Sequence, residues 1–318
     1  MTALITGATG FIGRRLVQPN DRALVRNAKS FSNAVVGELL NRPSLRDACE
    51  GIETVFHCAG YAHAFRETDP EVHWRINFEG TRNLLEAAGH AGVTRFVFLS
   101  SVKAMAEPGD NCVDEDWPGE PLTPYGKAKR AAEEAVLDAG TKYGMHVVNL
   151  RLTMVYGGDG RGNLERLARG IRAGWFPPLP ETENRRSLVH VDDVISVMRL
   201  VAERPEANGR TYIVADPCAY SGREIYDAIR SILGQSAVPP APTFPWRVPV
   251  GLLKAGGAVG DLLGAILRRQ FPLNSEVVDR LLGSAWYSPA LIERELGWRA
   301  QIGLNEGLRE MLGSESSV

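Results

Sequence analysis

Tyr125 and Lys129 stand four residues apart in the segment TPYGKAK, and this spacing is the first sign of chemistry in the chain. If a helix begins here, both side chains lie on one of its faces. A free tyrosine has a pKa of about 10, but a nearby ammonium favours the phenolate. The pair therefore predicts an acid/base for a substrate hydroxyl. The plainer alternative is a half-buried aromatic ring beside a surface charge.

A hydroxyl group near the pair would strengthen this interpretation. The run FVFLSSVK reads as a buried strand that ends in Ser100 and Ser101. In a parallel sheet, ligands bind outside the carboxyl ends of the strands. A serine at that place can hydrogen-bond the reacting oxygen and orient it.

Three glycines, Gly7, Gly10 and Gly13, follow the apolar start of the chain in GATGFIG. Between a strand and a helix, such a turn lets backbone N–H groups approach a pyrophosphate, and a Cβ would block that approach. The spacing alone also fits an ordinary turn. Its place directly after an N-terminal strand favours dinucleotide binding.

The second strand, RALVRN, ends in Arg26 and Asn27, where an acid favours NAD and an arginine accepts a 2'-phosphate. Arg26 therefore favours NADP, with adenine stacking or a solvated position as alternatives. Glu38 is a candidate partner for the adenine amino group, or a solvated loop acid. Only eight residues separate Gly13 from this strand, whereas a covering helix needs about ten or more. We expect a shortened first helix, which leaves NAD and NADP both open.

Short apolar runs alternate with helical patterns in the first half of the chain, which predicts an α/β fold with a Rossmann-type doubly wound parallel sheet. Helices are expected at residues 78–91 and 125–143 from their apolar spacing. Strands are expected at residues 3–6, 22–25, 34–36, 54–57, 95–100 and 146–150.

The pattern changes after Tyr156, where glycine-rich and proline-rich stretches replace the alternation. We expect a dinucleotide-binding domain at residues 1–156 and a smaller, mostly helical substrate-binding lobe at residues 157–318. Residues 187–215 are expected to return to the sheet as a helix (187–201) and a strand (211–214). The apolar stretch 248–267 contains Lys254 and Asp261, each costing roughly 2.5 to 3.5 kcal/mol at a bilayer centre, so a helix packed on the lobe is favoured over a membrane anchor.

The bulk composition limits the partners and the location to be expected. Lys plus Arg number 36 and Asp plus Glu 38, for a net charge of −2, which suggests neither a nucleic acid nor an anionic membrane as partner. No leader is visible, so we expect a cytoplasmic protein without an integral membrane segment. The four cysteines lie far apart, which predicts free thiols and no metal site.

These motifs together resemble a known family, the extended short-chain dehydrogenases, and within it the NAD-dependent epimerase/dehydratase group. The resemblance runs through GATGFIG, HCAG, INFEGT, SSVK, YGKAK, LRLTMVYG and RRSLVHVDDV. It implies Ser101, Tyr125 and Lys129 as the catalytic residues, with Lys129 also holding the nicotinamide ribose. The cofactor, NAD or NADP, is expected to lie against a larger set of residues. These are Gly7, Gly10, Phe11, Ile12, Gly13, Arg26, Glu38, Leu39, Cys58, Ala59, Gly60, Asn77, Ser100, Tyr125, Lys129 and Leu152.

The resemblance also implies a nucleotide-sugar substrate. Arginine suits phosphate geometry, and Arg186 matches the segment that grips the diphosphate in the family. Asn163, Arg280 and Lys103 are further candidate substrate contacts, with solvated surface side chains as the alternative. His190 and Asp192 are expected to play a structural role.

The family's dehydratases carry an Asp-Glu pair after the catalytic Ser or Thr, whereas this chain has Val102 and Lys103. The leading hypothesis is therefore epimerisation at the fourth carbon of a nucleoside-diphosphate hexose. The alternatives are an NADPH-dependent 4-keto-sugar reductase and a steroid or alcohol dehydrogenase of the same fold. A regulatory protein that binds the dinucleotide without turnover is disfavoured by the intact triad. Family members are often dimers through a helix bundle, so a homodimer is expected.

Overall fold

The structure is a computed structural model that describes residues 2–27, 31–61, 71–160, 162–174, 176, 178–235, 249–267 and 274–314. For residues 163, 263, 265–267, 276, 277, 280, 281 and 314, only the backbone is described.

Seven parallel strands form the main sheet, in the order β10-β7-β5-β4-β1-β2-β3. Their apolar residues are buried because helices cover both faces, which is the usual setting of a parallel sheet. The predicted doubly wound sheet is confirmed. Its strands are β1 (Ala3–Thr6), β2 (Arg22–Val25), β3 (Ala34–Val36), β4 (Thr54–His57), β5 (Arg95–Ser101), β7 (His146–Leu152) and β10 (Arg210–Val214).

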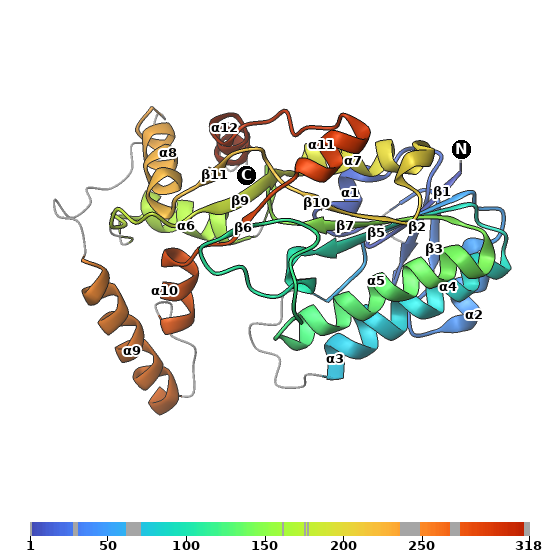
Figure 1. Cartoon of the computed structure of the whole chain (residues 1–318), viewed down its shortest axis with the longest axis horizontal. Coiled ribbons are helices and arrows are strands. Elements are labelled where there is room, and N and C mark those ends of the chain that lie inside the picture. Colours follow the sequence, from blue (N-terminus) through green and yellow to red (C-terminus); the bar gives the residue numbers. More distant parts are fainter. Residues whose placement is uncertain are drawn as a thin grey trace.

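Alternate residues of each strand enter different cores. In β1, Leu4 packs into the core under α2 (Arg42–Cys49), α4 (Gly80–His90) and α5 (Pro124–Tyr143). Ala3 and Ile5 enter the opposite core, under α1 (Gly13–Leu16), α7 (Val191–Glu203) and α11 (Ala290–Leu296). Figure 1 shows the two helical layers on either side of the sheet.

The first helix, α1, is short, as its sequence length predicts. It spans only Gly13–Leu16. The Arg199 guanidinium of α7 donates a 2.6 Å hydrogen bond to the Leu16 carbonyl, which satisfies one of the acceptors left at the helix end.

Helix α5 has clear start and stop signals. The Thr123 side chain accepts a hydrogen bond from the Gly126 N–H, Pro124 occupies the first turn, and Gly144 takes a left-handed conformation beyond the last residue. The first turn of α5 lies against residues 102–104, a 3-10 turn directly after β5. Tyr125 is therefore held at the carboxyl edge of the sheet.

The helix expected at residues 78–91 has an irregular start. Residues Glu71–His73 form α3, Trp74–Glu79 form a π-helix, and α4 follows from Gly80. The remaining short strands β6 (Cys112–Val113) and β12 (Trp286–Tyr287) pair with each other.

The second lobe has its own core and a three-stranded sheet, β11-β9-β8. One expectation was wrong here: residues 187–190 belong to a strand, and the helix begins only at Val191. The apolar run SLVHV fits either element. The lobe contains β8 (Met154–Tyr156), α6 (Asn163–Arg172), β9 (Arg186–His190), β11 (Ala219–Tyr220), α8 (Gly222–Gly234), α9 (Val250–Leu267), α10 (Ser275–Leu282) and α12 (Leu304–Ser314).

Candidate active site

The glycine loop lies in close contact with the HCAG turn that follows β4. Gly7 has a φ of +68°, and a Cβ there would lie 2.7 Å from the Ala59 nitrogen. A Cβ on Gly13 would collide with the Gly7 carbonyl. Only glycine fits these positions, and the open backbone around Gly10 fits the pyrophosphate of a dinucleotide.

A buried histidine, His57, connects the strand before the glycine loop to the helix that begins at Gly80. The Thr81 hydroxyl donates a 2.7 Å hydrogen bond to the Asn77 carbonyl, so His57 Nε2, 2.9 Å from the Thr81 oxygen, must donate to it. Nδ1 then accepts from the Thr6 hydroxyl at 2.7 Å. Burial lowers the pKa of His57 to about 3, with the Lys129 charge adding to the effect, so this neutral tautomer persists. Sequence reasoning missed Thr6, His57 and Thr81 in this role.

Asn77 closes the same turn through its side chain. Its amide accepts a 2.7 Å hydrogen bond from the Tyr61 N–H and donates to the Tyr61 carbonyl at 3.1 Å. A Cβ on Gly60 would lie 3.2 Å from Asn77 Oδ1 and 3.7 Å from Lys129 Nζ. The HCAG turn, the π-helix and α5 therefore meet at one point.

Tyr125 and Ser101 come together at the end of β5. Burial raises the pKa of Tyr125 to about 12, and a side-chain hydrogen bond with Ser101 opposes this rise. The Lys103 N–H donates to Ser101 Oγ at 3.2 Å, which leaves the Ser101 proton available to the phenol oxygen or to a substrate oxygen. The predicted serine and tyrosine thus share one site.

Lys129 is buried beside them, with 5% of its surface exposed. Its ammonium donates a 2.7 Å hydrogen bond to the Leu99 carbonyl and lies 4.4 Å from the centre of the Phe98 ring. Burial lowers the pKa of Lys129 to about 8, and the carboxylate of Glu133 opposes the shift. A positive charge held at this depth favours the phenolate of a neighbouring tyrosine.

Ser100 lies on the other side of the strand from Ser101. Its hydroxyl donates a 2.6 Å hydrogen bond to Glu133, which also forms a buried ion pair with Arg151 at 2.8 Å. Glu133 and Arg151 were not expected from the sequence. The signal was present, because Glu133 follows Lys129 by one helical turn.

His73 is a further residue that sequence reasoning missed. Its ring lies edge-on to the Tyr125 ring, with 5.7 Å between centres. Its Nδ1 donates to the Tyr61 carbonyl at 3.2 Å, because a carbonyl can only accept. No motif marked this position, since the contact depends on the turn that joins α3 to the π-helix.

The residues expected around the adenosine lie on the neighbouring strand ends. Arg26 and Glu38 are exposed beyond β2 and β3, and Leu39 packs beside Gly80 of α4. Phe11 lies under the guanidinium of Arg15, 5.9 Å from its carbon. Further along the same edge, Ile12 precedes α1, Cys58 follows β4, and Leu152 pairs in register with Ser101.

The predicted substrate residues come from four separate segments of the chain. Arg186 begins β9 and donates a 2.9 Å hydrogen bond to the Gly283 carbonyl. Lys103 forms a 2.7 Å ion pair with Glu107. Asn163 and Arg280 belong to α6 and α10, and their side chains lie outside the described part of the structure.

His190 and Asp192 take part in contacts that fit the expected structural role. His190 accepts a 3.3 Å hydrogen bond from the Asp192 N–H at the start of α7. With Glu310 they form a group whose ligand atoms lie within 4.8 Å of one another. Arg15 forms ion pairs with both carboxylates, so a side-chain cation already balances this cluster.

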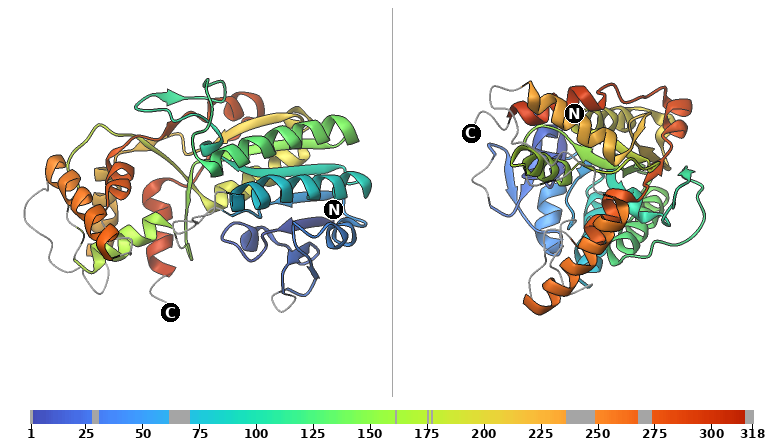
Figure 2. Two further views of the ribbon diagram at one scale, coloured as in Figure 1. Left: turned by 90° about the horizontal axis from the view of Figure 1, so that it is seen from below. Right: turned by 90° about the vertical axis from the view of Figure 1, so that its left-hand side faces the viewer.

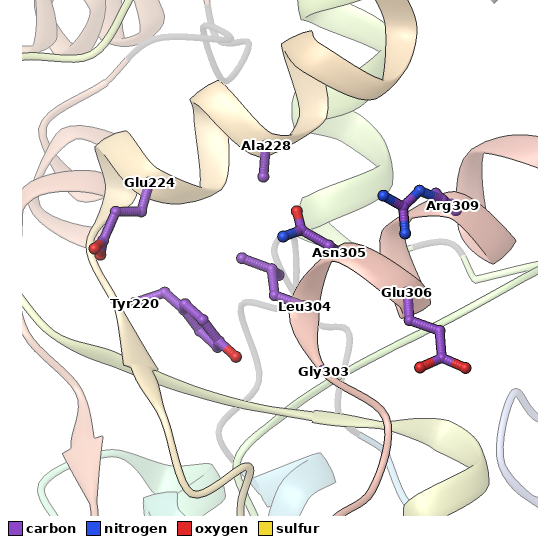
Figure 3. A pocket seen from close by; sticks show the side chains of 8 residues that line it. All are labelled: Tyr220, Glu224, Ala228, Gly303, Leu304, Asn305, Glu306 and Arg309. Atoms are coloured by element: carbon purple, nitrogen blue, oxygen red, sulfur yellow. The ribbon is translucent and has the colours of Figure 1, made fainter. Parts of the chain in front are cut away.

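A hollow of about 500 Å³ lies elsewhere in the second lobe, between α8 and α12. Figure 3 shows Tyr220, Glu224 and Arg309 around it. Its lining contains none of the residues expected to bind cofactor or substrate.

Residues 3–215 match the model of the NAD dependent epimerase/dehydratase family. The chain is 29% identical to a UDP-glucose 4-epimerase of Vibrio cholerae, over 96% of this chain and 93% of the relative. It is 25% identical to an N-acetyl-alpha-D-glucosaminyl-diphospho-ditrans,octacis-undecaprenol 4-epimerase of Escherichia coli O157:H7, over 98% and 94%. The structure of MoeE5 in complex with UDP-glucose and NAD superposes with a TM-score of 0.77 at 25% identity, over 99% of both chains. The chain therefore belongs to the NAD-dependent epimerase/dehydratase family, as its motifs predict.

Proposed function

We propose that the protein is a 4-epimerase of hexoses joined through a diphosphate to a nucleoside. The observation that carries this proposal is the contact between Ser101 and Tyr125, beside the buried ammonium of Lys129 and next to the glycine cradle. Val102 and Lys103 follow Ser101 where a dehydratase of this family carries an acid pair.

In the proposed reaction, Tyr125 takes the proton of the sugar's 4-hydroxyl as a phenolate and returns it after the ring has turned over. A nicotinamide held by the glycine loop and the HCAG turn would supply a hydride acceptor and donor at that carbon. Ser101 hydrogen-bonds the reacting oxygen, and Lys129 keeps the phenol ionisable and holds the ribose. The net reaction neither gains nor loses electrons.

The finer assignments form part of the same proposal. We assign the cofactor to the expected residues on the edge from Gly7 to Leu152, and the substrate diphosphate to Arg186, with Lys103, Asn163 and Arg280 as further contacts. In this proposal residues 1–156, joined by residues 191–215 that return to the main sheet, form the dinucleotide-binding part, and the rest of residues 157–318 forms the substrate-binding part. The homodimer and the cytoplasmic location stay predictions.

A second candidate is an NADPH-dependent 4-keto-sugar reductase. It is favoured by Arg26, which is exposed at the end of β2, where a 2'-phosphate would lie. The absorbance spectrum of the purified protein separates the two, because an epimerase is expected to retain tightly bound NAD. A reductase is expected to be purified without cofactor and to consume NADPH when a 4-keto sugar is added.

A hexose joined through its diphosphate to a polyprenol, in place of a nucleoside, is also supported as a substrate. The E. coli relative is named for a sugar on undecaprenyl diphosphate, and the exposed apolar side chains of Leu252, Val259 and Leu262 on α9 favour an amphiphilic substrate. Neither α9 nor any other helix in the described ranges is long and apolar enough to cross a membrane. The direct test follows UDP-glucose, UDP-N-acetylglucosamine and a polyprenyl-diphosphate sugar by NMR of the proton at the fourth carbon. Conversion of none of them with NAD bound would refute the epimerase proposal.

A further inference from the structure

The helical segment before α4 runs beside α5. Figure 1 and the left-hand view of Figure 2 show α3, the π-helix and α4 lying along α5. The π-helix interrupts an otherwise α-helical segment, and such interruptions are frequent at functional sites. His73 is the last residue of α3, directly before the interruption. Its ring contacts two others: that of Tyr61, which follows the HCAG turn, and that of Tyr125 in the first turn of α5.

The imidazole of His73 is anchored on the backbone of Tyr61. The Tyr61 carbonyl accepts one hydrogen bond from His73 Nδ1 at 3.2 Å and another from the Asn77 amide at 3.1 Å. A carbonyl oxygen has two lone pairs, so it can accept both. The Asn77 amide also accepts from the Tyr61 N–H at 2.7 Å. The backbone that holds the His73 ring is therefore itself held on both sides.

The second contact of the His73 ring is with the phenol of Tyr125. The ring centres are 5.7 Å apart and the planes are inclined by 73°, an edge-to-face arrangement that aromatic rings favour. The main chain beside Tyr125 is closely packed, because a Cβ on Gly126 would collide with the Lys103 carbonyl. Rotation about the side-chain bonds of Tyr125 remains, and it would carry the phenol oxygen away from Ser101. The His73 ring stands in the way of that rotation.

We propose that His73 is a positioning residue for the acid/base: it holds the Tyr125 ring so that the phenol oxygen stays beside Ser101. This rests on the function proposed above, in which Tyr125 moves the proton of the sugar hydroxyl. His73 acts on the geometry of the phenol, because its own Nδ1 proton is held by the Tyr61 carbonyl. A misplacement of about 1 Å can reduce turnover about a hundredfold, so a fixed ring bears directly on kcat.

The first test measures kcat, KM and NAD affinity of variants of the full-length enzyme. The substrate is UDP-glucose, UDP-N-acetylglucosamine or the polyprenyl-diphosphate sugar, whichever is converted. His73→Ala removes the ring and should lower kcat by about tenfold to a hundredfold. Its KM and NAD affinity should stay within about threefold of the unchanged enzyme. His73→Phe keeps a ring and should recover most of the lost kcat, whereas His73→Asn keeps an N–H donor without the ring and should not.

His90→Ala is the matched control. His90 of α4 lies edge-on to Tyr143 of α5, again with 5.7 Å between the ring centres and with 67° between the planes. This pair lies at the other end of the two helices, away from the site. Its loss removes the same kind of contact and should leave kcat unchanged. Equal losses of kcat in His73→Ala and His90→Ala would assign the effect to helix packing and overturn the proposal.

A measurement without turnover checks the contact itself. The chain has eight tyrosines, and labelling the NAD-bound protein with 3-fluorotyrosine gives each of them a fluorine NMR signal. The signals of Tyr125 and Tyr143 are assigned by their loss in Tyr125→Phe and Tyr143→Phe. His73→Ala should shift the Tyr125 signal and leave that of Tyr143 in place, and His90→Ala should do the reverse. A Tyr125 signal that does not respond to His73→Ala would overturn the proposal.

A double-mutant cycle shows whether the effect of His73 passes through the phenol. His73→Ala should cost little further turnover once the hydroxyl has been removed in Tyr125→Phe, and additive losses would overturn the proposal. A large loss in Tyr125→Phe beside an unchanged kcat in His73→Ala would overturn the role of His73 alone. Normal turnover in Tyr125→Phe, or conversion of none of the sugars, would refute the function proposed for the site and the role of His73 with it.

Discussion

Glu310, close to the C-terminal end of the chain, accepts a 3.1 Å hydrogen bond from Arg15 in the short helix behind the glycine loop. The same carboxylate accepts from the Gly158 N–H at 3.3 Å, and Arg15 also donates to Asp192 and to the Gly158 carbonyl, each at 2.8 Å. Three segments far apart in the sequence therefore meet beside α1. The hydrogen-bonded charges raise the pKa of Arg15 against the opposing effect of burial, so the guanidinium remains charged.

Replacing Glu310 with glutamine is expected to loosen α12 from α1. Partly exposed ion pairs contribute roughly 0.2 to 1 kcal/mol each, so the free energy of unfolding should fall by about 1 kcal/mol or less. Because Arg15 lies beside the glycine loop, NAD should also bind a few-fold more weakly. Isothermal calorimetry and thermal unfolding measure the two effects. Glu306→Gln on the same helix is the matched control, and an equal loss of NAD affinity in it would contradict the proposed link.

Tyr125→Phe removes the acid/base and leaves the ring in place. Turnover is expected to fall by about a hundredfold to ten-thousandfold, the usual contribution of a positioned proton-transfer group. NAD affinity should change little. Stopped-flow kinetics measure turnover, and quenching of the protein's fluorescence by NAD measures cofactor affinity. As a control, Tyr143→Phe at the far end of α5 should keep normal activity. Retained turnover in Tyr125→Phe would remove the phenol from the mechanism.

Much of the fold could be read from the sequence because its signals are local. The strand before Gly7 and the apolar run before Ser100 are short, continuous and bounded by turn residues, and all seven expected strands of the main sheet are present. The segment after Arg186 shows the limit. Its apolar residues satisfy both helical and strand spacing, and the pairing of Arg186 with Tyr220 of β11 decides for a strand.

The residues that support the site were less accessible to sequence reasoning. Tyr125 and Lys129 belong to one motif with local spacing, and Ser101 ends an apolar strand at the carboxyl edge of the sheet, so their meeting could be predicted. His57 and Thr81 act through side-chain hydrogen bonds across 24 residues, and the contact between Arg15 and Glu310 spans 295. Such contacts are set by how whole elements pack, which no local pattern records.

Glu133→Gln is expected to destabilise the protein strongly. Glu133 and Arg151 are both buried, with side-chain exposures of 2% and 6%, and Ser100 shares the same carboxylate. Loss of one partner leaves a buried guanidinium uncompensated, which costs about 3 to 5 kcal/mol. Urea unfolding measures the change. Glu134→Gln, at the exposed neighbouring position of the same helix, should change the unfolding free energy by less than about 0.5 kcal/mol.

Lys129→Met separates the two roles of the buried ammonium. In the folded protein its pKa is lowered to about 8, below the value of about 10.4 expected for the unfolded chain. The folded state therefore binds fewer protons than the unfolded state between these two pH values, so stability should rise as the pH rises from 8 to 10. Below pH 8 both states are protonated and the full penalty of the buried charge applies, at most about 3 kcal/mol. The methionine variant should lose this dependence and be at least as stable at neutral pH.

The same substitution should reduce turnover, because the charge that favours the Tyr125 phenolate is gone. In the unchanged enzyme, deprotonation of Lys129 should make turnover fall as the pH rises above about 8. Urea unfolding between pH 7 and 10 measures how the stability of the unchanged enzyme and of Lys129→Met depends on pH. The pH profile of kcat measures the alkaline fall in turnover of the same two proteins. A methionine variant that keeps both the slope of stability with pH and the alkaline fall in kcat would show that another group titrates there.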